Sequence, residues 1–299
     1  MKDQAHTLRR IFEGEAYNSP MVLSVTSGKG GVGKTSIVVN MAILLALKGK
    51  KVLVLDADLG LANVDVMLGL TPKLTIKHVL DGDCPLEDIV IEGPCGIKII
   101  PASSGIQELA DLQPEQQITL MNALDYFDHD LDYMIVDTGA GISRNVMYFN
   151  AAAQRIVVVA TAEPTSITDA YALIKVMRLQ YGIKRFYLII NNVTSKSEGD
   201  QVAEKLTFVC ERFLGDVTLD MLGSIPHDKN IPECIKVQKA FVRVHQQTEA
   251  TKRLARIAGR LEDSSRLGTS GNLQFFFRRM LLNQAKGTSH AGYRLHGTY

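Results

Sequence analysis

Residues 28–35 read Gly-Lys-Gly-Gly-Val-Gly-Lys-Thr, and this stretch decides the fold. It satisfies the pattern G-x-x-x-x-G-K-[ST] of loops that cradle nucleotide phosphates. An apolar, β-branched run precedes it over Met21–Thr26, and a helical pattern follows over Ser36–Leu47. Glycines let backbone N–H groups close around phosphate oxygens, and the start of a helix adds positive potential. The sequence therefore predicts a strand, a phosphate-binding loop and a helix, in that order.

This loop supplies most of the predicted nucleotide contacts. They are Gly28, Lys29, Gly30, Gly31, Val32, Gly33, Lys34, Thr35 and Ser36. Lys34 is expected to reach the β- and γ-phosphates, and the Thr35 hydroxyl to bind Mg²⁺, so the predicted cofactors are ATP or ADP with Mg²⁺. Lys29 is a second lysine inside the loop. It is either a solvated surface charge or a second cation directed at phosphate.

Beyond the loop, short apolar runs alternate with longer helical stretches. The runs are Met21–Thr26, Val52–Leu55, Ile97–Ile100, Tyr133–Val136, Ile156–Ala160, Phe186–Ile190 and Met221–Ile225. Nearly continuous apolar runs are typical of strands covered on both faces, and stretches such as Thr165–Gln180 suit crossover helices. The predicted fold over residues 21–262 is α/β, a doubly wound, mostly parallel sheet of the P-loop NTPase type. Ligands are expected at the carboxyl ends of its strands.

Charge and cysteine content disfavour several functional classes. The 299 residues carry a net charge of +1, but residues 264–299 hold five basic and no acidic side chains, which leaves the rest at −4. Such a body disfavours DNA binding, and no specific nucleic-acid partner is predicted. Four cysteines without a C-x-x-C pair disfavour zinc and iron–sulfur sites. No apolar run is long enough to span a membrane, so we expect a chain that is soluble or attached to a membrane surface.

Carboxylates follow two of the predicted strands. Asp56 and Asp58 come after Val52–Leu55, and Asp137 comes after Tyr133–Val136. Asp137, at the end of an apolar strand beside a phosphate loop, is a predicted ligand of the magnesium shell. Of the other pair, one carboxylate can hold Mg²⁺ through water while the second orients the attacking water. The alternative is that the pair only caps a turn.

Two later strand ends are candidates for a base pocket. Asn191 follows Phe186–Ile190, and Pro226-His227-Asp228 follows Met221–Ile225. The side-chain amide of Asn191 offers both a donor and an acceptor to an adenine edge. Simple turn chemistry explains the same residues about equally well.

The phosphate loop resembles the deviant Walker A loop of the MinD/ParA ATPases. In that family the extra lysine, here Lys29, reaches the nucleotide of the opposite subunit in an ATP-sandwiched dimer. The resemblance therefore implies a homodimer on ATP with Lys29, Lys34 and Asp58 as catalytic residues, Asp58 positioning the hydrolytic water. It places Thr35, Asp56 and Asp137 at the metal. It also assigns adenine contacts to Asn191, Pro226 and Asp228.

The five residues that begin at Asp137 resemble one branch of this family more than the others. The stretch Asp137-Thr138-Gly139-Ala140-Gly141 resembles FlhG, a MinD-like branch also called FleN or YlxH. MinD usually has Pro at the position of Gly139. Relatives often have Arg at the position of Asn192, so no role is assigned to Asn192.

An N-terminal arm and linker are predicted over residues 1–20. Leu8, Ile11 and Phe12 share a helical face, which suits either a helix-in-groove contact with a partner or a frayed or self-docked leader. The pattern D-Q-A-x-x-L-R, with Gln4 and Leu8, resembles the activator motif by which FlhG stimulates the GTPase FlhF. The resemblance implies that residues 3–12 bind an FlhF-type GTPase of the signal-recognition kind.

Residues 263–299 are predicted to form a linker, an amphipathic helix over 273–285 and a disordered tail. Phe276, Phe277 and Met280 share one helical face, and Arg278 and Arg279 flank it. An apolar-basic helix on a flexible linker suits an anionic membrane surface, and the alternative is a helix docked on the body. Its place and kind resemble the membrane-targeting helix of MinD and FlhG.

The expected function is a slow, Mg²⁺-dependent ATP hydrolase that switches by dimerisation. The resemblance implies a cytoplasmic protein, reversibly peripheral on the cytoplasmic face of the inner membrane. It also implies control of the number and placement of flagella, with flagellar transcription regulators or basal-body components as further partners. The alternatives are a positioning ATPase of the MinD or ParA kind, serving the division site or a DNA cargo, and an iron–sulfur carrier.

Overall fold

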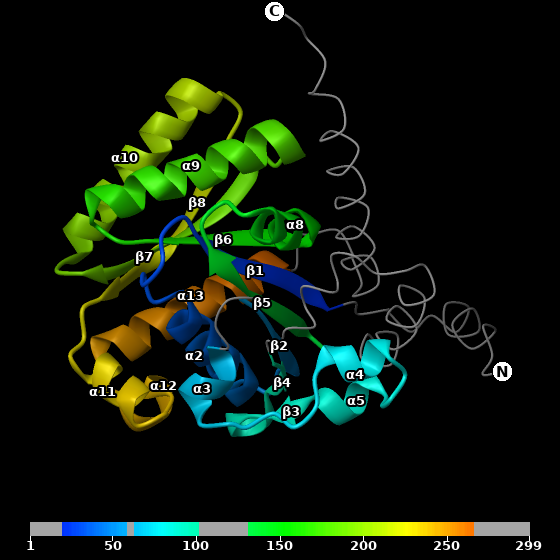
Figure 1. Ribbon diagram of the computed structural model, residues 1–299. Coiled ribbons are helices and arrows are strands. Elements are labelled where there is room, and N and C mark those ends of the chain that lie inside the picture. The colour runs from blue at the N-terminus through cyan, green and yellow to red at the C-terminus, as the bar shows by residue number, and fades with distance from the viewer. Residues whose placement is uncertain (1–19, 59–62, 102–130, 266–299) are drawn as a thin grey trace, which may run out of the picture.

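The computed structural model describes residues 20–58, 63–101 and 131–265. Eight strands form one sheet in the order β3-β4-β2-β5-β1-β6-β7-β8 (Figure 1). The strands are β1 Met21–Ser27, β2 Val52–Ala57, β3 Ile91–Glu92, β4 Lys98–Ile100, β5 Tyr133–Ala140, β6 Arg155–Ala160, β7 Arg185–Val193 and β8 Thr218–Pro226. Every neighbouring pair is parallel except β3 with β4, which is antiparallel.

Helices cover both faces of this sheet. They are α2 Lys34–Leu47, α3 Val64–Leu68, α4 Ile76–Leu80, α5 Leu86–Ile89, α8 Arg144–Ala152, α9 Pro164–Tyr181, α10 Lys196–Leu214, α11 Asn230–Lys236, α12 Phe241–Val244 and α13 Glu249–Ser265, with a 3₁₀ turn at Pro94–Gly96. One face packs against α2, α3, α12 and α13. The other packs against α8, α9 and α10, with α4 and α5 towards the β2 end. The chain is therefore doubly wound, as predicted.

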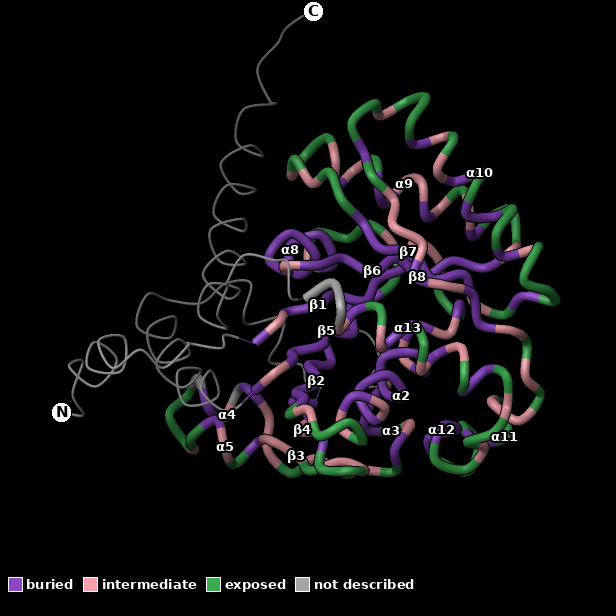
Figure 2. The backbone as a smooth tube through the Cα atoms, turned by 180° about the vertical axis from the view of Figure 1, so that it is seen from behind, coloured by how far each residue is buried: buried purple, intermediate pink, exposed green. Residues whose placement is uncertain are grey.

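The continuous apolar strands follow from this three-layer arrangement. Along β2, Val52 and Val54 pack with α2 and α13, whereas Leu53 and Leu55 pack with α4, α5 and α8. Because successive side chains of a strand point to opposite faces, a strand covered on both sides needs apolar residues at every position. Figure 2 shows the consequence, since β2 and β6 are buried along their whole length and β1 and β5 along nearly all of theirs.

All seven predicted strands are present, and the helices expected over Ser36–Leu47 and Thr165–Gln180 are found as α2 and α9. Among the strands of the described residues, β3 is the one that the sequence did not predict. No helix among the described residues is long and apolar enough to cross a bilayer. The predicted N-terminal arm and the predicted helix over 273–285 lie outside the described residues, as do Gln4, Leu8, Phe276, Phe277 and Met280.

The parallel order brings the predicted site residues to one edge of the sheet. Strand β1 lies between β5 and β6, and its carboxyl end leads into the phosphate loop. Register pairs Asp56 of β2 directly with Asp137 of β5. The ends of β7 and β8 meet where Val193 pairs with Pro226. Residues as far apart in sequence as Asp56 and Pro226 thus lie around one loop.

Candidate nucleotide-binding site

Backbone geometry of the loop explains its glycines. Gly31 and Gly33 have φ values of 77° and 87°, in the left-handed region that favours glycine. A Cβ on Gly28 would lie 2.2 Å from the backbone of Asp169, so the loop can pack against α9 only with glycine there. Helix α2 begins directly after Gly33 with no side-chain cap. Its first N–H groups are therefore available to an anion, as phosphate binding requires.

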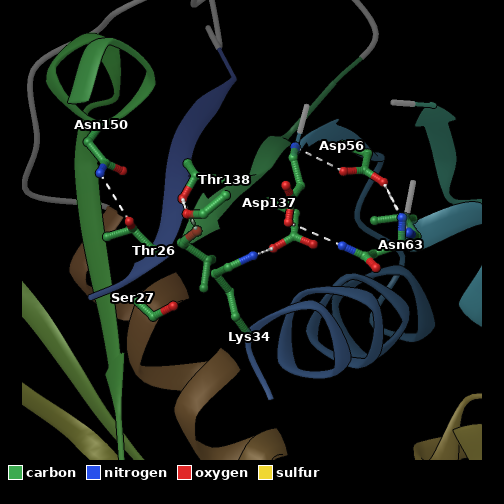
Figure 3. Close-up of polar contacts among 12 residues, drawn as sticks. Thr26, Ser27, Lys34, Asp56, Asn63, Asp137, Thr138 and Asn150 are labelled. Carbon is green, nitrogen blue, oxygen red and sulfur yellow. Dashed lines mark hydrogen bonds and ion pairs between the residues drawn. The ribbon is translucent and has the colours of Figure 1, made fainter. Parts of the chain in front are cut away.

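Lys34 points inward to the end of β5. Its Nζ lies 2.6 Å from Asp137 Oδ1, and both side chains are buried, Lys34 being 7% exposed and Asp137 0% (Figure 3). Burial raises the pKa of Asp137, while the Lys34 ammonium and the Thr35 hydroxyl oppose that rise. The pair joins the phosphate loop to the strand that the sequence predicted to carry a metal ligand.

The second oxygen of Asp137 fits a magnesium shell. Asp137 Oδ2 is buried and has no partner among the described residues that meets hydrogen-bond geometry. A buried carboxylate oxygen without a donor is costly unless a cation or its water occupies the adjoining space. Mg²⁺ usually keeps several waters and takes one or two carboxylates, so Asp137 with the Thr35 hydroxyl is a sufficient protein contribution. The residues therefore fit this metal.

Asp56 organises the loop that follows β2. Its Oδ1 accepts the backbone N–H of Asp58 at 3.2 Å, and its Oδ2 accepts those of Asn63 and Val64, each at 3.0 Å. Burial raises the pKa of Asp56 to about 6, the charge of Asp137 adds to the rise, and the N–H of Val64 opposes it. The structure bears on both readings of Asp56, as the cap of a turn and as a carboxylate near the predicted metal site. It accepts the N–H groups of the turn, and it pairs in register with Asp137, the other strand-end carboxylate predicted to bind the metal.

Asn63 is a site residue that the sequence reasoning missed. Its Nδ2 donates to Asp58 Oδ2 at 3.2 Å, while its backbone N–H binds Asp56. Asp58 and Asn63 line a cavity of about 760 Å³ together with Lys34 and Thr35. The only available signal was an Asn at the start of a short apolar helix, α3, just after the two aspartates. The predicted water-positioning carboxylate therefore shares a cavity with the predicted phosphate ligands.

Lys29 is not among the residues that line this cavity, and it lines the smaller cavity described below. Its Nζ donates to Glu163 Oε2 at 2.5 Å and to Thr165 Oγ1 at 2.9 Å. These partners stand at the start of α9, and sequence reasoning gave neither a role. The Lys29 side chain is 36% exposed, against 7% for Lys34. The two lysines of the phosphate loop therefore contact different elements: Lys34 contacts the end of β5, and Lys29 contacts the start of α9.

A second cavity, of about 320 Å³, adjoins the other side of the loop. The predicted base contacts Asn191, Pro226 and Asp228 all line it, together with Gly30–Gly33. Asn191 Nδ2 donates to Val32 O at 2.8 Å. A Cβ on Gly33 would lie 2.4 Å from that nitrogen, so the glycine permits the contact. The predicted base contacts are thus brought together against the phosphate loop.

Comparison with known proteins agrees with this geometry. The family model described as ParA, NUBPL iron-transfer P-loop NTPase, matches residues 18–262. The antiactivator FleN of Pseudomonas aeruginosa is 44% identical over 90% of this chain and 96% of its own. The flagellum site-determining protein YlxH of Helicobacter pylori is 35% identical over 87% and 89% of the two chains. A chain of the MinC:MinD cell division protein complex of Aquifex aeolicus superposes with a TM-score of 0.64 at 26% identity, over 84% of this chain and 99% of that one.

The family match over residues 18–262 covers the phosphate loop, both carboxylate-bearing strand ends and the residues that line the smaller cavity. The FleN and YlxH matches extend over nearly all of both chains, as expected of relatives that share a whole architecture. The chain therefore belongs to the ParA family of P-loop ATPases, as a homologue of FleN and YlxH.

Proposed function

We propose that this protein is an ATP-driven dimerisation switch with slow, Mg²⁺-dependent hydrolysis. The supporting observation is the divergence of the two loop lysines. Lys34 is buried against Asp137, whereas Lys29 is half-buried and, among the described residues, is held by Glu163 and Thr165. A cation at the rim of the site is available to phosphate brought by a second copy of the chain. In this proposal two nucleotides are sandwiched between two copies, and each Lys29 serves the partner's nucleotide.

Hydrolysis is assigned to residues that surround the larger cavity. Lys34 and the first N–H groups of α2 bind and orient the β- and γ-phosphates. Asp58, held by Asn63, accepts a hydrogen bond from the attacking water and aligns it with the γ-phosphorus. Thr35, Asp56 and Asp137 would hold Mg²⁺, directly or through water. When bound, the ion neutralises charge that develops on the phosphate oxygens.

The names of the relatives suggest what the switch controls. FleN is named an antiactivator and YlxH a flagellum site-determining protein. We therefore assign this protein to the control of flagellar number and placement, at the cytoplasmic face of the inner membrane. The membrane contact is assigned to residues 273–285. Residues 3–12 are assigned to an FlhF-type GTPase, and flagellar transcription regulators or basal-body components remain candidate partners.

The flagellar assignment can be tested in a flagellated bacterium whose own homologous gene is deleted. Expression of this chain should restore the number of flagella per cell, counted by electron microscopy. The Lys34→Ala variant should not restore it, because it lacks the main side-chain cation at the phosphates and should not bind nucleotide. Lys175→Ala changes an exposed lysine of α9 away from the site and should behave as the unchanged chain. Restoration by Lys34→Ala would separate flagellar control from nucleotide binding and contradict the proposal.

A further inference from the structure

We infer that Gln238 is a positioning residue for hydrolysis, because it holds helix α3 and, through Asn63, the carboxylate of Asp58. The inference rests on the proposed hydrolysis of ATP. Gln238 Nε2 donates to Val66 O of α3 at 2.9 Å, a contact that spans 172 residues of sequence. All four of these residues line the cavity of about 760 Å³. The contact therefore stands at the cavity where hydrolysis is proposed.

The backbone at Gln238 places a glutamine where glycine is preferred. Gln238 has φ of 55°, in the left-handed region. Its N–H donates to Ile235 O at 3.0 Å, and the next N–H, of Lys239, donates to Cys234 O at 2.9 Å. These two bonds close the end of α11 in a Schellman motif, whose left-handed position is usually glycine. Because the turn itself would be less strained with glycine, this outlier directs attention to what the side chain does.

The side chain of Gln238 lies over the carboxyl end of α3, which Figures 1 and 2 both show beside α12. A Cβ on Gly69, the residue that ends α3, would lie 3.1 Å from Gln238 Oε1, so the amide is closely fitted there. Five residues are too few to hold a helix in place by its own hydrogen bonds. Val64 and Leu68 anchor its inner side in the core, and Gln238 contacts its outer side, where Val66 is 58% exposed.

Helix α3 carries this contact to the predicted water-positioning carboxylate. Asn63 precedes α3, and its carbonyl oxygen accepts the N–H of Met67 at 3.0 Å, so the first turn of the helix holds Asn63. Asn63 Nδ2 in turn donates to Asp58 Oδ2 at 3.2 Å. Lys34 and Asp137 lie on α2 and β5 and pair with each other. A displaced α3 should therefore disturb Asp58 while leaving the phosphate contacts in place, so turnover and nucleotide affinity should separate.

The test compares Gln238→Gly with the unchanged full chain at saturating ATP and Mg²⁺. A misplacement of about 1 Å can cost about a hundredfold in rate. Because Asp56 still accepts the N–H of Asn63, the displacement should be smaller and turnover should fall about tenfold. The Kd of a non-hydrolysable ATP analogue should stay unchanged. Glycine suits the left-handed turn, so the midpoint of thermal unfolding should not fall.

Two further variants separate the contact from the backbone. Gln238→Asn keeps an amide and a residue that tolerates the left-handed conformation, but it is one methylene too short to reach Val66 O. It should lose turnover as Gln238→Gly does. In a chain that already carries Asp58→Ala, Gln238→Gly should lower the residual turnover no further, because the two residues act in one path.

Gln246→Gly is the matched control. The amide of Gln246 also donates to a backbone carbonyl, Arg243 O at 3.4 Å, but Gln246 does not line the cavity. This variant should hydrolyse ATP at the ordinary rate.

Ordinary turnover in Gln238→Gly or Gln238→Asn, an equal loss of affinity for the analogue, or a further loss beside Asp58→Ala would overturn the inference and leave the proposed function intact. A Gln238→Gly chain that light scattering shows to be monomeric under turnover conditions would also overturn it, because the residue would then act in the contact between subunits. If the unchanged chain hydrolyses ATP no faster than Lys34→Ala does, the proposed function and the inference fall together.

Discussion

Lys29 Nζ lies 2.5 Å from Glu163 Oε2 of the same chain, so the exposed lysine of the phosphate loop is held by its own subunit. The two side chains are 36% and 63% exposed. Ion pairs between exposed groups of this kind stabilise by about 0–1 kcal/mol. In the proposed dimer, exchanging Glu163 for the phosphates of a second subunit would therefore cost little free energy, so this contact is compatible with the proposed role of Lys29.

The first prediction concerns Lys29→Ala. This variant should bind ATP with nearly unchanged affinity, because Lys34 and the N–H groups of α2 remain. It should stay monomeric at ATP concentrations that dimerise the unchanged chain, as measured by analytical ultracentrifugation. The control variant is Lys175→Ala, which removes an exposed lysine of α9. It should dimerise on ATP as the unchanged chain does. A Lys29→Ala dimer of ordinary affinity would remove the cross-subunit role from this residue.

The second prediction follows from the raised pKa of Asp56. Its folded-state pKa of about 6 exceeds the ordinary value of 3.8, so between these values the metal-free folded chain holds a proton that the unfolded chain has released. The free energy of unfolding should therefore fall as pH rises from about 4 to 6, by roughly 3 kcal/mol for this group at most. Asp137, whose pKa is also raised by burial, contributes with the same sign.

Urea unfolding of the metal-free chain at several pH values measures this effect. Other groups titrate in the same range, so the informative quantity is the difference from Asp56→Asn, which has no proton to exchange at that position. The variant should lose a large part of the decrease between pH 4 and 6, whatever its absolute stability. Parallel curves for the two proteins would show that Asp56 keeps an ordinary pKa.

The third prediction concerns the membrane segment. One short apolar-basic helix binds lipid weakly, whereas two helices in a dimer bind far better through effective concentration. Flotation with anionic vesicles should therefore require ATP, and replacing Arg278 and Arg279 by Gln should weaken it. Vesicles without anionic lipid serve as the control. Equal flotation of a chain ending at Glu262 would exclude residues 273–285 as the anchor.

The fourth prediction concerns the N-terminal arm. A peptide of residues 1–20 should raise the GTP turnover of an FlhF-type GTPase without the ATPase domain. Gln4→Ala should keep most of the binding but lose stimulation, since the amide is proposed to orient a water in the partner's site. Leu8→Ala should weaken binding itself by removing an apolar anchor. Unchanged GTP turnover at saturating peptide would exclude the arm as an activator.

Most of the fold could be predicted because its signals are local. Each central strand is a run of apolar residues long enough to be recognised alone, as in β2 and β6. Strand β3 could not be predicted, because its two residues become a strand only by pairing with β4. Helices α3, α4 and α5 have five residues or fewer, too short to display a helical period.

The residues of the site also fall into those with a local sequence signal and those without one. The phosphate loop is contiguous, so its sequence alone specifies a strand, a turn and a helix start. Asn63 and Glu163 are placed at the site by contacts made in the folded chain, with Asp58 and Lys29 respectively. The Lys29–Glu163 contact spans 134 residues of sequence, and no local pattern around Glu163 announces it. Such partners become visible only when the strand ends are assembled.

The central claim is that ATP assembles the dimer and hydrolysis releases it, and Asp58→Ala tests it most directly. This variant keeps Lys29, Lys34 and the phosphate loop but loses the carboxylate that orients the attacking water. Static light scattering at saturating ATP and Mg²⁺ should show a persistent dimer, with phosphate release reduced to a small fraction of that of the unchanged chain. Adding Lys29→Ala to Asp58→Ala should return it to a monomer. Monomeric Asp58→Ala at saturating ATP, or a dimer that turns over ATP at the ordinary rate, would contradict the account.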